Sequence, residues 1–382
     1  MVGMKTLSRM TSTAMRDTAM LDKAGRTMAS VKYQQKVPAS LTGESIATSP
    51  EASPVSLRPL MDRFGRAVTY VRLSVTDRCD LRCTYCMPKR FKDFEEPQDW
   101  LTFDEIERVI GLFTRMGVSR VRMTGGEPLL RRNLVDLSAK LAQLPGLNDL
   151  SLSTNATQLA KHALPLRQAG VRRLNVSLDT LSRECMARIT GSDSMDKVMD
   201  GLRAAKAAGF SPIKLNMVVM PGINAWEVAD MMAFCTEQGF ILRLIETMPV
   251  GETGRQTPYQ PLEPVLDSLR QRFDLIPEIL EMGGGPARYW RTPDGRGKLG
   301  LITPISQHFC DTCNRVRLSV DGTLHLCLGQ EQQFQLRPML RAGATDQEIE
   351  QAIRTAIELK PERHHFNEQP EKIIRFMSQT GG

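Results

Sequence analysis

The chain has 382 residues, of which 41% are hydrophobic and 24% are charged. These fractions are close to globular averages and exclude wholesale disorder and collagen-like architecture. No run approaches the length of about 18 apolar residues that a membrane-spanning helix needs. The formal net charge is +7, but residues 1–60 carry eight basic and four acidic side chains. The rest of the chain is therefore nearly neutral, and no nucleic-acid-binding face is expected.

The first 60 residues are rich in Ser, Thr, Ala and Met and show little apolar periodicity. This composition predicts a disordered leader that the chemistry does not need. An organellar transit peptide is an alternative, although the four acidic residues count against it. A true start at Met28 or Met61 fits the sequence equally well.

From residue 68 onward, short β-rich runs alternate with helix-like runs. Strands are expected at 68–75, 119–123, 149–153, 172–178, 212–220 and 241–246, with helices near 103–116 and 132–143. Gly117, Gly170, Gly209 and Gly239 each end a helix-like run, where a left-handed C-cap belongs. Repeated βα units without long insertions predict an α/β fold, a partial TIM-like barrel of parallel strands rather than a doubly wound sheet. Ligands are then expected at the carboxyl ends of the strands.

After residue 250 the prolines multiply, and Gly283, Gly284 and Gly285 form a loop. We interpret the triple glycine as a plain loop rather than a phosphate cradle. The expected organisation is a leader (1–60), a barrel core (61–250) and a C-terminal α+β subdomain (251–382) that closes the open end of the barrel.

Six of the eight cysteines form two tight groups. They are Cys79, Cys83 and Cys86, spaced C-x3-C-x2-C, and Cys310, Cys313 and Cys327, spaced C-x2-C-x13-C. Clustered cysteines in a long chain without a secretory signal indicate metal ligation in a reducing compartment, so we expect a cytoplasmic location. The two remaining cysteines, Cys185 and Cys235, lie in helix-like stretches and are expected to be buried small hydrophobes.

Each triad offers one thiolate fewer than the four that a [4Fe–4S] cluster normally takes. An iron without a protein ligand would be open to a small molecule, as in catalytic metal sites. A zinc site is the alternative. It lacks a nearby histidine at the first triad, but His308 and His325 could complete it at the second. Because the chain already has one such triad, a second cluster with an open iron is favoured over zinc at the second triad. That iron could ligate a substrate nitrogen or oxygen.

The segment Thr124-Gly125-Gly126-Glu127-Pro128 follows the second predicted strand. Its glycines would let backbone groups approach an amino-acid head, and Glu127 could pair with the ammonium group of that head. Together with the first cysteine spacing, this motif resembles the radical S-adenosylmethionine superfamily. The resemblance implies a cluster and S-adenosylmethionine that together generate a 5′-deoxyadenosyl radical.

Further strings are similar to the GTP 3′,8-cyclase family, and the likeness runs from about residue 62 to the C-terminus. They are Arg72–Cys79, Arg131-Arg132, Asn175–Asp179, Cys310–Arg317 and the terminal Gly381-Gly382 pair. The resemblance implies an enzyme that cyclises GTP to (8S)-3′,8-cyclo-7,8-dihydroguanosine 5′-triphosphate, the first step of molybdenum cofactor (molybdopterin) biosynthesis. The radical would abstract hydrogen from ribose C3′, and the C3′ radical would add to guanine C8.

The same resemblance implies a role for each matching residue. Two [4Fe–4S] clusters would be held by Cys79, Cys83 and Cys86 and by Cys310, Cys313 and Cys327. S-adenosylmethionine would contact Tyr85, Gly126, Ser177 and Met248, besides Glu127. GTP would contact Arg72, Arg122, Ser153, Lys214, Arg315, Val316 and Arg317. Arg243 and Arg72 would act in catalysis, with Arg72 drawn in by the tail, Gly381 and Gly382. Ser153 stands where the family often has Thr, Ala156 where Gly is common and Arg120 where Lys is frequent.

The chain has no G-x4-G-K-S/T phosphate loop, so it is not an ordinary phosphoryl-transfer GTPase. Scattered Arg and Lys on strand ends would instead anchor the triphosphate. Two alternatives remain open: a radical enzyme with an auxiliary cluster that modifies a peptide or tRNA, and a non-catalytic iron–sulfur carrier or scaffold. The expected partners are GTP, a flavodoxin- or ferredoxin-like electron donor and the downstream pterin enzymes, without nucleic acid or membrane. A monomer or homodimer is expected.

Overall fold

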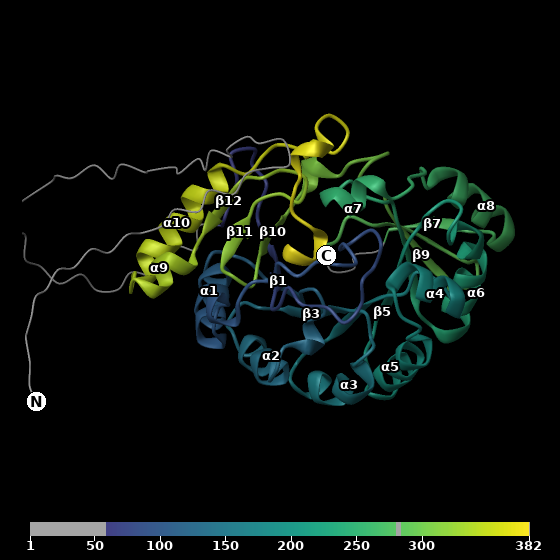
Figure 1. The fold of residues 1–382 in the computed structure, drawn as a ribbon, viewed down its shortest axis with the longest axis horizontal. Coiled ribbons are helices and arrows are strands. Elements are labelled where there is room, and N and C mark those ends of the chain that lie inside the picture. The colour runs from purple at the N-terminus through teal and green to yellow at the C-terminus, as the bar shows by residue number, and fades with distance from the viewer. Residues whose placement is uncertain (1–58, 280–283, 382) are drawn as a thin grey trace, which may run out of the picture. The chain divides into compact units, whose positions relative to one another are not determined.

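The computed structural model describes residues 59–279 and 284–381, and Figure 1 shows their arrangement. Six parallel strands form the centre of the sheet. They are β1 (Tyr70–Ser74), β2 (Arg120–Thr124), β3 (Asp149–Thr154), β4 (Arg173–Ser177), β5 (Ile213–Val218) and β6 (Ile241–Ile245). All six expected strands are confirmed, with ends that differ by at most two residues.

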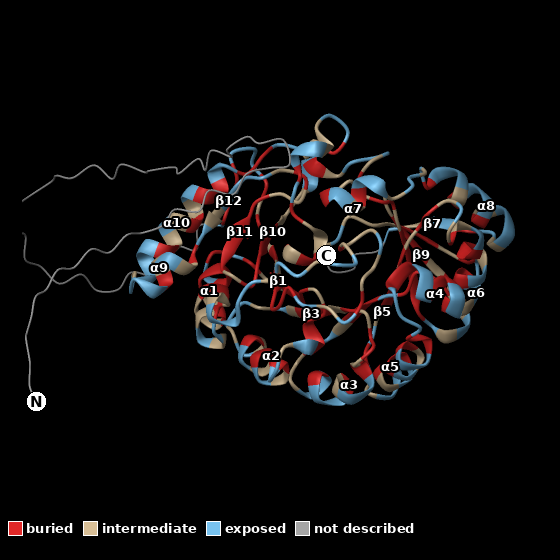
Figure 2. Cartoon of the chain, in the orientation of Figure 1, coloured by how far each residue is buried: buried red, intermediate tan, exposed pale blue. Residues whose placement is uncertain are grey.

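Helices cover the outer, convex face of these strands (Figure 1). They are α1 (Phe103–Arg115), α2 (Leu134–Ala142), α3 (Leu159–Gln168), α4 (Arg183–Thr190), α5 (Met195–Ala207) and α6 (Val228–Gln238). The apolar core lies between helices and sheet, where Figure 2 shows the strands as largely buried. The four glycines expected at helix ends have φ values of +96°, +96°, +76° and +74°, which confirms the left-handed C-caps.

The remaining strands extend both edges of this sheet. On one side are β10 (Arg315–Leu318), β11 (Thr323–His325) and β12 (Gln333–Gln335), and on the other are β9 (Lys298–Ile302), β8 (Arg288–Arg291) and β7 (Ile276–Glu278). The order is β12-β11-β10-β1-β2-β3-β4-β5-β6-β9-β8-β7, and β10 and β9 run parallel to β1 and β6. The sheet is mostly parallel and does not close, so the partial barrel is confirmed.

Shorter helices complete the described residues. They are α7 (Gly251–Gln256), α8 (Glu263–Phe273), α9 (Arg337–Arg341), α10 (Asp346–Glu358) and the 3-10 turns η1 (Pro97–Asp99), η2 (Pro128–Leu130), η3 (Ala225–Glu227), η4 (Cys310–Thr312), η5 (Pro370–Lys372) and η6 (Met377–Gln379). Segment 251–382 thus supplies strands to both edges of the sheet, and the boundary expected at residue 250 stays a prediction. The leader lies outside the described residues up to residue 58, whereas Leu60 is buried in the core.

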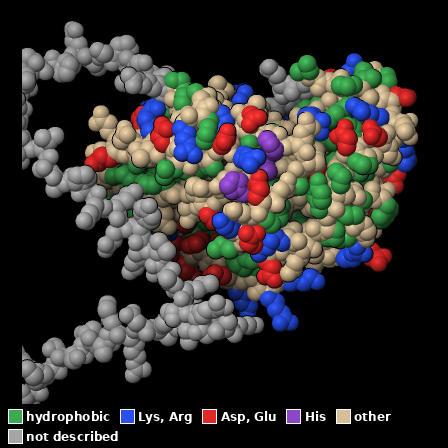
Figure 3. Space-filling view, turned by 90° about the horizontal axis from the view of Figure 1, so that it is seen from above, with side chains coloured by type: hydrophobic (Ala, Val, Ile, Leu, Met, Phe, Trp, Pro, Cys, Tyr) green, Lys and Arg blue, Asp and Glu red, His purple; other side chains and the backbone are tan. Residues whose placement is uncertain are grey.

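No helix in the described parts of the chain is both long and apolar enough to cross a bilayer. On the face seen in Figure 3, Lys and Arg side chains are mixed with Asp and Glu rather than gathered in one patch.

Gly201 in α5 marks the closest approach of a helix to the β3–α3 turn. A Cβ atom there would lie 2.6 Å from the Ala156 carbonyl oxygen and 3.0 Å from Leu159 Cβ. We expect Gly201→Ala to lower the free energy of unfolding by about 1–3 kcal/mol because the backbone oxygen cannot move away cheaply. Gly111→Ala, in the middle of α1, is the matched control. Its Cβ would meet Leu144 Cδ2 at 3.7 Å, so helix propensity should stabilise the protein by roughly 0.5–1 kcal/mol. Urea unfolding of Gly201→Ala and Gly111→Ala measures both changes in stability. Equal unfolding midpoints for the two variants would contradict the packing argument.

Candidate active site

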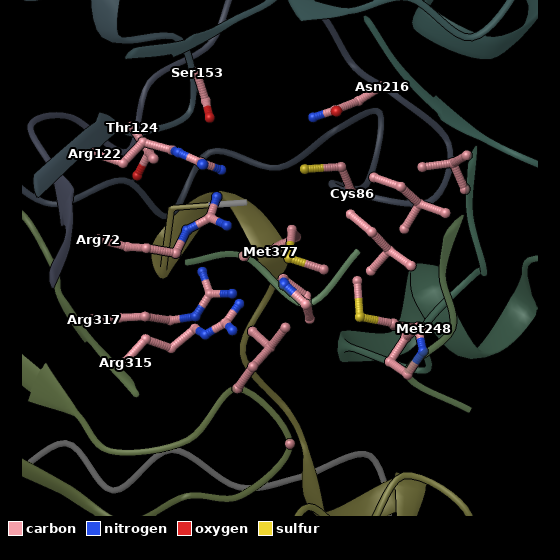
Figure 4. Close-up of a pocket in the computed structure, with 18 of the residues that line it drawn as sticks. Arg72, Cys86, Arg122, Thr124, Ser153, Asn216, Met248, Arg315, Arg317 and Met377 are labelled. Atoms are coloured by element: carbon pink, nitrogen blue, oxygen red, sulfur yellow. The ribbon is translucent and has the colours of Figure 1, made fainter. Parts of the chain in front are cut away.

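Both cysteine triads line one cavity of about 300 Å³ on the concave side of the sheet. Side chains from β1, β2, β3, β5 and β10 point into it, together with the loops that follow the strands. Figure 4 shows Arg72, Arg122, Arg315 and Arg317 on one side of the cavity and Cys86 and Met248 on the other, with Met377 between them. The cavity therefore offers sulfur ligands at two places and a cluster of guanidinium groups near them.

The first triad lies in the loop that follows β1. The Cys86 N–H donates to the Cys83 carbonyl over 2.9 Å, and Arg82 Nη1 donates to the Cys79 carbonyl over 2.6 Å. Burial raises the pKa of both Cys79 and Cys86 to about 12. The thiols are thus protonated when nothing is bound, and loading a metal cluster must release their protons.

The second triad spans η4 and the end of β11. Burial alone would raise the pKa of Cys313, but the Lys360 ammonium and the Arg315 guanidinium hold it below its ordinary value. All eight cysteines are free thiols. In the described residues no group of three His, Cys, Asp or Glu side chains is arranged to hold a metal ion. His325 lines the cavity, but His308 does not.

The glycines of the second motif are required by close backbone packing. A Cβ on Gly125 would lie 2.5 Å from the Thr76 carbonyl oxygen, and one on Gly126 would overlap the Arg78 carbonyl group. The Gly126 and Glu127 N–H groups donate to these same two carbonyls, each over 2.8 Å. The motif therefore fixes the loop that carries the first triad, a role that sequence reasoning did not anticipate.

Glu127 lies away from the position expected for a ligand of an ammonium group. Its carboxylate is buried beneath the β3–α3 turn, outside the cavity lining. It accepts hydrogen bonds from Thr154 Oγ1 and the Asn155 N–H, both over 2.7 Å, and from the Leu129 N–H over 3.1 Å. Burial raises the pKa of Glu127 to about 7. The carboxylate organises the turn, and its expected contact with a cofactor stays a prediction.

The four other residues expected at S-adenosylmethionine all line the cavity: Tyr85, Gly126, Ser177 and Met248. The Tyr85 hydroxyl donates to Asp179 Oδ2 over 2.8 Å, and Asp179 Oδ1 accepts from the Val218 N–H, also over 2.8 Å. Burial raises the pKa of Asp179 to about 6. Asp179 thus fixes Tyr85, a function that its place in a family string did not reveal.

Six of the seven residues expected at GTP line the cavity: Arg72, Arg122, Ser153, Arg315, Val316 and Arg317. The Nε atoms of Arg122 and Arg315 are buried and donate no hydrogen bond to any described residue. Buried donors of this kind call for an acceptor. An anionic ligand between the arginines would provide it.

Lys214, the seventh residue expected at GTP, does not lie where the sequence placed it. It is the second residue of β5, away from the carboxyl end where we expected it, and it is outside the cavity lining. Its side chain is 1% exposed, and Nζ lies 3.4 Å from the Tyr289 hydroxyl. Burial, together with repulsion from Arg243, lowers the pKa of Lys214 to about 6.

Arg243 is held firmly in the barrel interior. Its Nη2 donates to Asn175 Oδ1 and Asn216 Oδ1, each over 2.6 Å, and burial lowers its pKa to about 10. Asn216 was missed from the sequence, although strand alternation places it on the same inward face as Lys214.

The C-terminal tail reaches the cavity through a contact with Arg317, whose Nη1 donates to the carbonyls of Thr380 and Gly381. The expected contact between the tail and Arg72 stays a prediction. Gly381 has a φ of +72° and packs against Thr124 and Ser74. Its partner in the predicted pair, Gly382, lies outside the described residues.

Comparisons with known proteins agree with this architecture. The radical SAM superfamily profile matches residues 73–235, and the Molybdenum Cofactor Synthesis C profile matches residues 240–366. The fold is similar to Streptococcus suis SuiB bound to S-adenosylmethionine, with a TM-score of 0.52 and 15% identity, covering 77% of this chain and 69% of that one. The barrel part of the chain therefore matches the radical SAM superfamily, and its fold is that of a partial barrel.

Curated relatives narrow the family. The GTP 3′,8-cyclase of Ectopseudomonas mendocina is 46% identical over 85% of this chain and 98% of its own length. Those of Paracoccus denitrificans and Marinobacter nauticus are 45% and 46% identical, again over 85% of this chain and over 96% and 98% of their own lengths. The chain belongs to the GTP 3′,8-cyclase family, which confirms the resemblance stated from its motifs.

Proposed function

We propose that the chain cyclises GTP to (8S)-3′,8-cyclo-7,8-dihydroguanosine 5′-triphosphate, with a separate iron–sulfur cluster on each triad. One observation carries this proposal: both triads and the arginine cluster line the same cavity. Two separate triads in one cavity suit a reaction in which one centre activates the cofactor and the other holds the substrate. The product would enter molybdenum cofactor synthesis.

In this proposal Cys79, Cys83 and Cys86 hold one [4Fe–4S] cluster, and Cys310, Cys313 and Cys327 hold the other. The fit rests on the three thiols of each group, all of which line the cavity. When bound, the first cluster and S-adenosylmethionine supply the radical that removes hydrogen from ribose C3′.

The chain's own residues would bind and orient the two small molecules. Tyr85, Gly126, Ser177 and Met248 would contact S-adenosylmethionine, with Tyr85 fixed by Asp179. Arg72, Arg122, Arg315 and Arg317 would anchor the triphosphate through charge-assisted hydrogen bonds, beside Ser153 and Val316. Arg243, held by two asparagines, would stabilise charge near the reacting atoms, and the tail through Gly381 would close the site.

A flavodoxin- or ferredoxin-like protein would supply the electron, and the free cysteines fit a reducing compartment such as the cytoplasm. Two anaerobic measurements test the proposal. Metal analysis should find about eight irons, matching sulfide and no zinc per chain. Incubation with dithionite and S-adenosylmethionine should give much more 5′-deoxyadenosine with GTP than without it. A carrier would give none, and an enzyme acting on a peptide or tRNA would not respond to GTP.

Lys214 makes the substrate assignment testable by proton uptake. With a pKa of about 6, its amine is mostly neutral at pH 7.5, and a nearby triphosphate would favour the charged form. GTP binding is then expected to take up roughly one proton at pH 7.5, and none below about pH 5, where the amine is already charged. Calorimetry in two buffers of different ionisation enthalpy measures this. Lys214→Met should abolish the uptake, whereas Lys206→Met, at an exposed lysine, should preserve it. Equal heats in both buffers for the wild type would contradict the contact.

A further inference from the structure

A cationic side chain contacts each cysteine of the second triad. Arg66 Nη1 donates to the Cys310 carbonyl over 2.8 Å, and Arg375 Nη2 donates to the Cys327 carbonyl over 2.8 Å. At Cys313 the contact is to the sulfur itself, with Lys360 Nζ 3.3 Å from Sγ. Three positive charges from distant parts of the sequence therefore surround this triad.

Two of these charges are balanced by carboxylates. Arg66 Nε pairs with Asp62 at 2.6 Å, and Arg375 Nη1 pairs with Glu331 at 2.7 Å. Lys360 differs, since no carboxylate among the described residues lies within 4.0 Å of its ammonium group. Lys360 is therefore a positive charge at the Cys313 sulfur that no carboxylate among the described residues balances, in addition to the Arg315 guanidinium, which also acts on Cys313.

The position of Lys360 has no sufficient explanation in the fold alone. It follows the last turn of α10, where a cation is favourable, and its N–H donates to the Ile357 carbonyl over 3.0 Å. A lysine can meet that preference from solvent, because its long stem lets the ammonium reach water. Lys360 is instead 2% exposed, and burying an ammonium group is costly unless a negative charge accompanies it.

The first triad has a different environment. The sulfur of Cys79 lies 3.9 Å from the Asp80 carboxylate, 3.4 Å from the Leu81 N–H and 3.8 Å from Asn155 Nδ2. The Arg82 guanidinium donates to the backbone carbonyls of Cys79 and Leu81 there. Among the described residues, then, a lysine ammonium is hydrogen-bonded to sulfur at the second triad and a carboxylate neighbours sulfur at the first.

We propose that Lys360 is a positioning residue that sets the reduction potential of the second iron–sulfur centre by donating a charged hydrogen bond to the Cys313 sulfur. This inference rests on the proposed function, in which the second triad holds a cluster. Net charge and hydrogen bonds to sulfur are the means by which a protein tunes such potentials. A buried ammonium stabilises the more negative, reduced form, so the second centre has a higher potential than it would have without Lys360.

The test uses the full chain carrying Cys83→Ala, which removes a ligand of the first triad and leaves the second centre for spectroscopy. Anaerobic redox titration followed by electron paramagnetic resonance gives its midpoint potential. Lys360→Met should lower the midpoint potential by at least about 59 mV. For a one-electron couple this equals a tenfold change in the ratio of reduced to oxidised centre. Lys360→Arg should restore most of it. Lys372→Met, which removes an exposed lysine from η5, should leave the potential unchanged.

Iron content separates the outcomes. If Lys360→Met loses the second centre, Lys360 is required for assembly of the cluster rather than for its potential, and the inference is overturned. A midpoint in Lys360→Met equal to that of Lys372→Met also overturns the inference, while the two-cluster proposal stands in both cases. If the chain with native Lys360 carries zinc or no second signal, the two-cluster proposal fails, and the role of Lys360 fails with it.

Discussion

Replacing Cys310 with alanine is expected to leave 5′-deoxyadenosine formation largely intact while cyclised nucleotide falls by about 100-fold, the cost of misplacing a substrate that depends on the lost ligand. The two triads lie on different loops, so losing one thiol from the second leaves the backbone bonds of the first unchanged. The bond from Arg66 to the Cys310 carbonyl also survives because it involves no side-chain atom of Cys310. Anaerobic turnover with both products quantified by chromatography measures the separation.

Two comparisons make this prediction specific. Cys83→Ala, in the first triad, should abolish both products. Cys185→Ala removes a buried thiol in α4, outside the cavity, whose Sγ contacts the Ile223 carbonyl at 3.4 Å, and it should give both products at the wild-type level. A full yield of cyclised nucleotide from Cys310→Ala would exclude a role for the second triad in the reaction. Equal loss of both products would mean that the two sites are not separable.

The barrel was predictable because each of its βα units is local. The run 213–218 alternates apolar Ile213, Leu215 and Met217 with other residues, which is the period of a strand. Gly239 marks the end of the preceding helix without reference to the rest of the chain. Hydrophobic periodicity and C-cap chemistry act over a few residues. They therefore place the six central strands and their helices correctly.

The edges of the sheet could not be predicted in this way. Pairing of β10 with β1 joins Arg72 to Arg317, residues that are far apart in the sequence. Nothing within either strand specifies that partner, because parallel pairing is decided by tertiary packing. The same pairing brings the arginines of two strands to one cavity, so the density of positive charge in the site is a consequence of topology.

Residues that support the site were the hardest to find. Lys360 follows an amphipathic helix and has the sequence context of an ordinary surface lysine, and Glu127 lies in a motif that suggested ligand binding. Their roles depend on burial and on specific partners, Cys313 for one and the Thr154–Asn155 turn for the other. Sequence spacing contains no information on either.

Gly381→Ala is expected to reduce cyclised product by at least about tenfold. An alanine at a left-handed φ costs about 1–2 kcal/mol of folding free energy, which by itself does not change the rate. The loss of rate comes from displacing the tail, and 1.4 kcal/mol of lost transition-state stabilisation is about a factor of ten. In addition, the new Cβ would overlap Thr124 Oγ1 and lie 3.5 Å from Ser74 Cβ. The tail must withdraw, and Arg317 then loses its acceptors on Thr380 and Gly381.

Gly343→Ala is the matched control, since Gly343 has a φ of +78° with no atom within 4 Å of the added Cβ. The Gly343→Ala variant carries the same backbone strain without a steric overlap, so it should form cyclised product at the wild-type rate. If the two variants give equal amounts of cyclised product, the placement of the tail in the cavity does not matter to the reaction. A loss of product in Gly381→Ala alone, together with faster proteolysis of its tail, would show that cyclisation depends on the contact between the tail and Arg317.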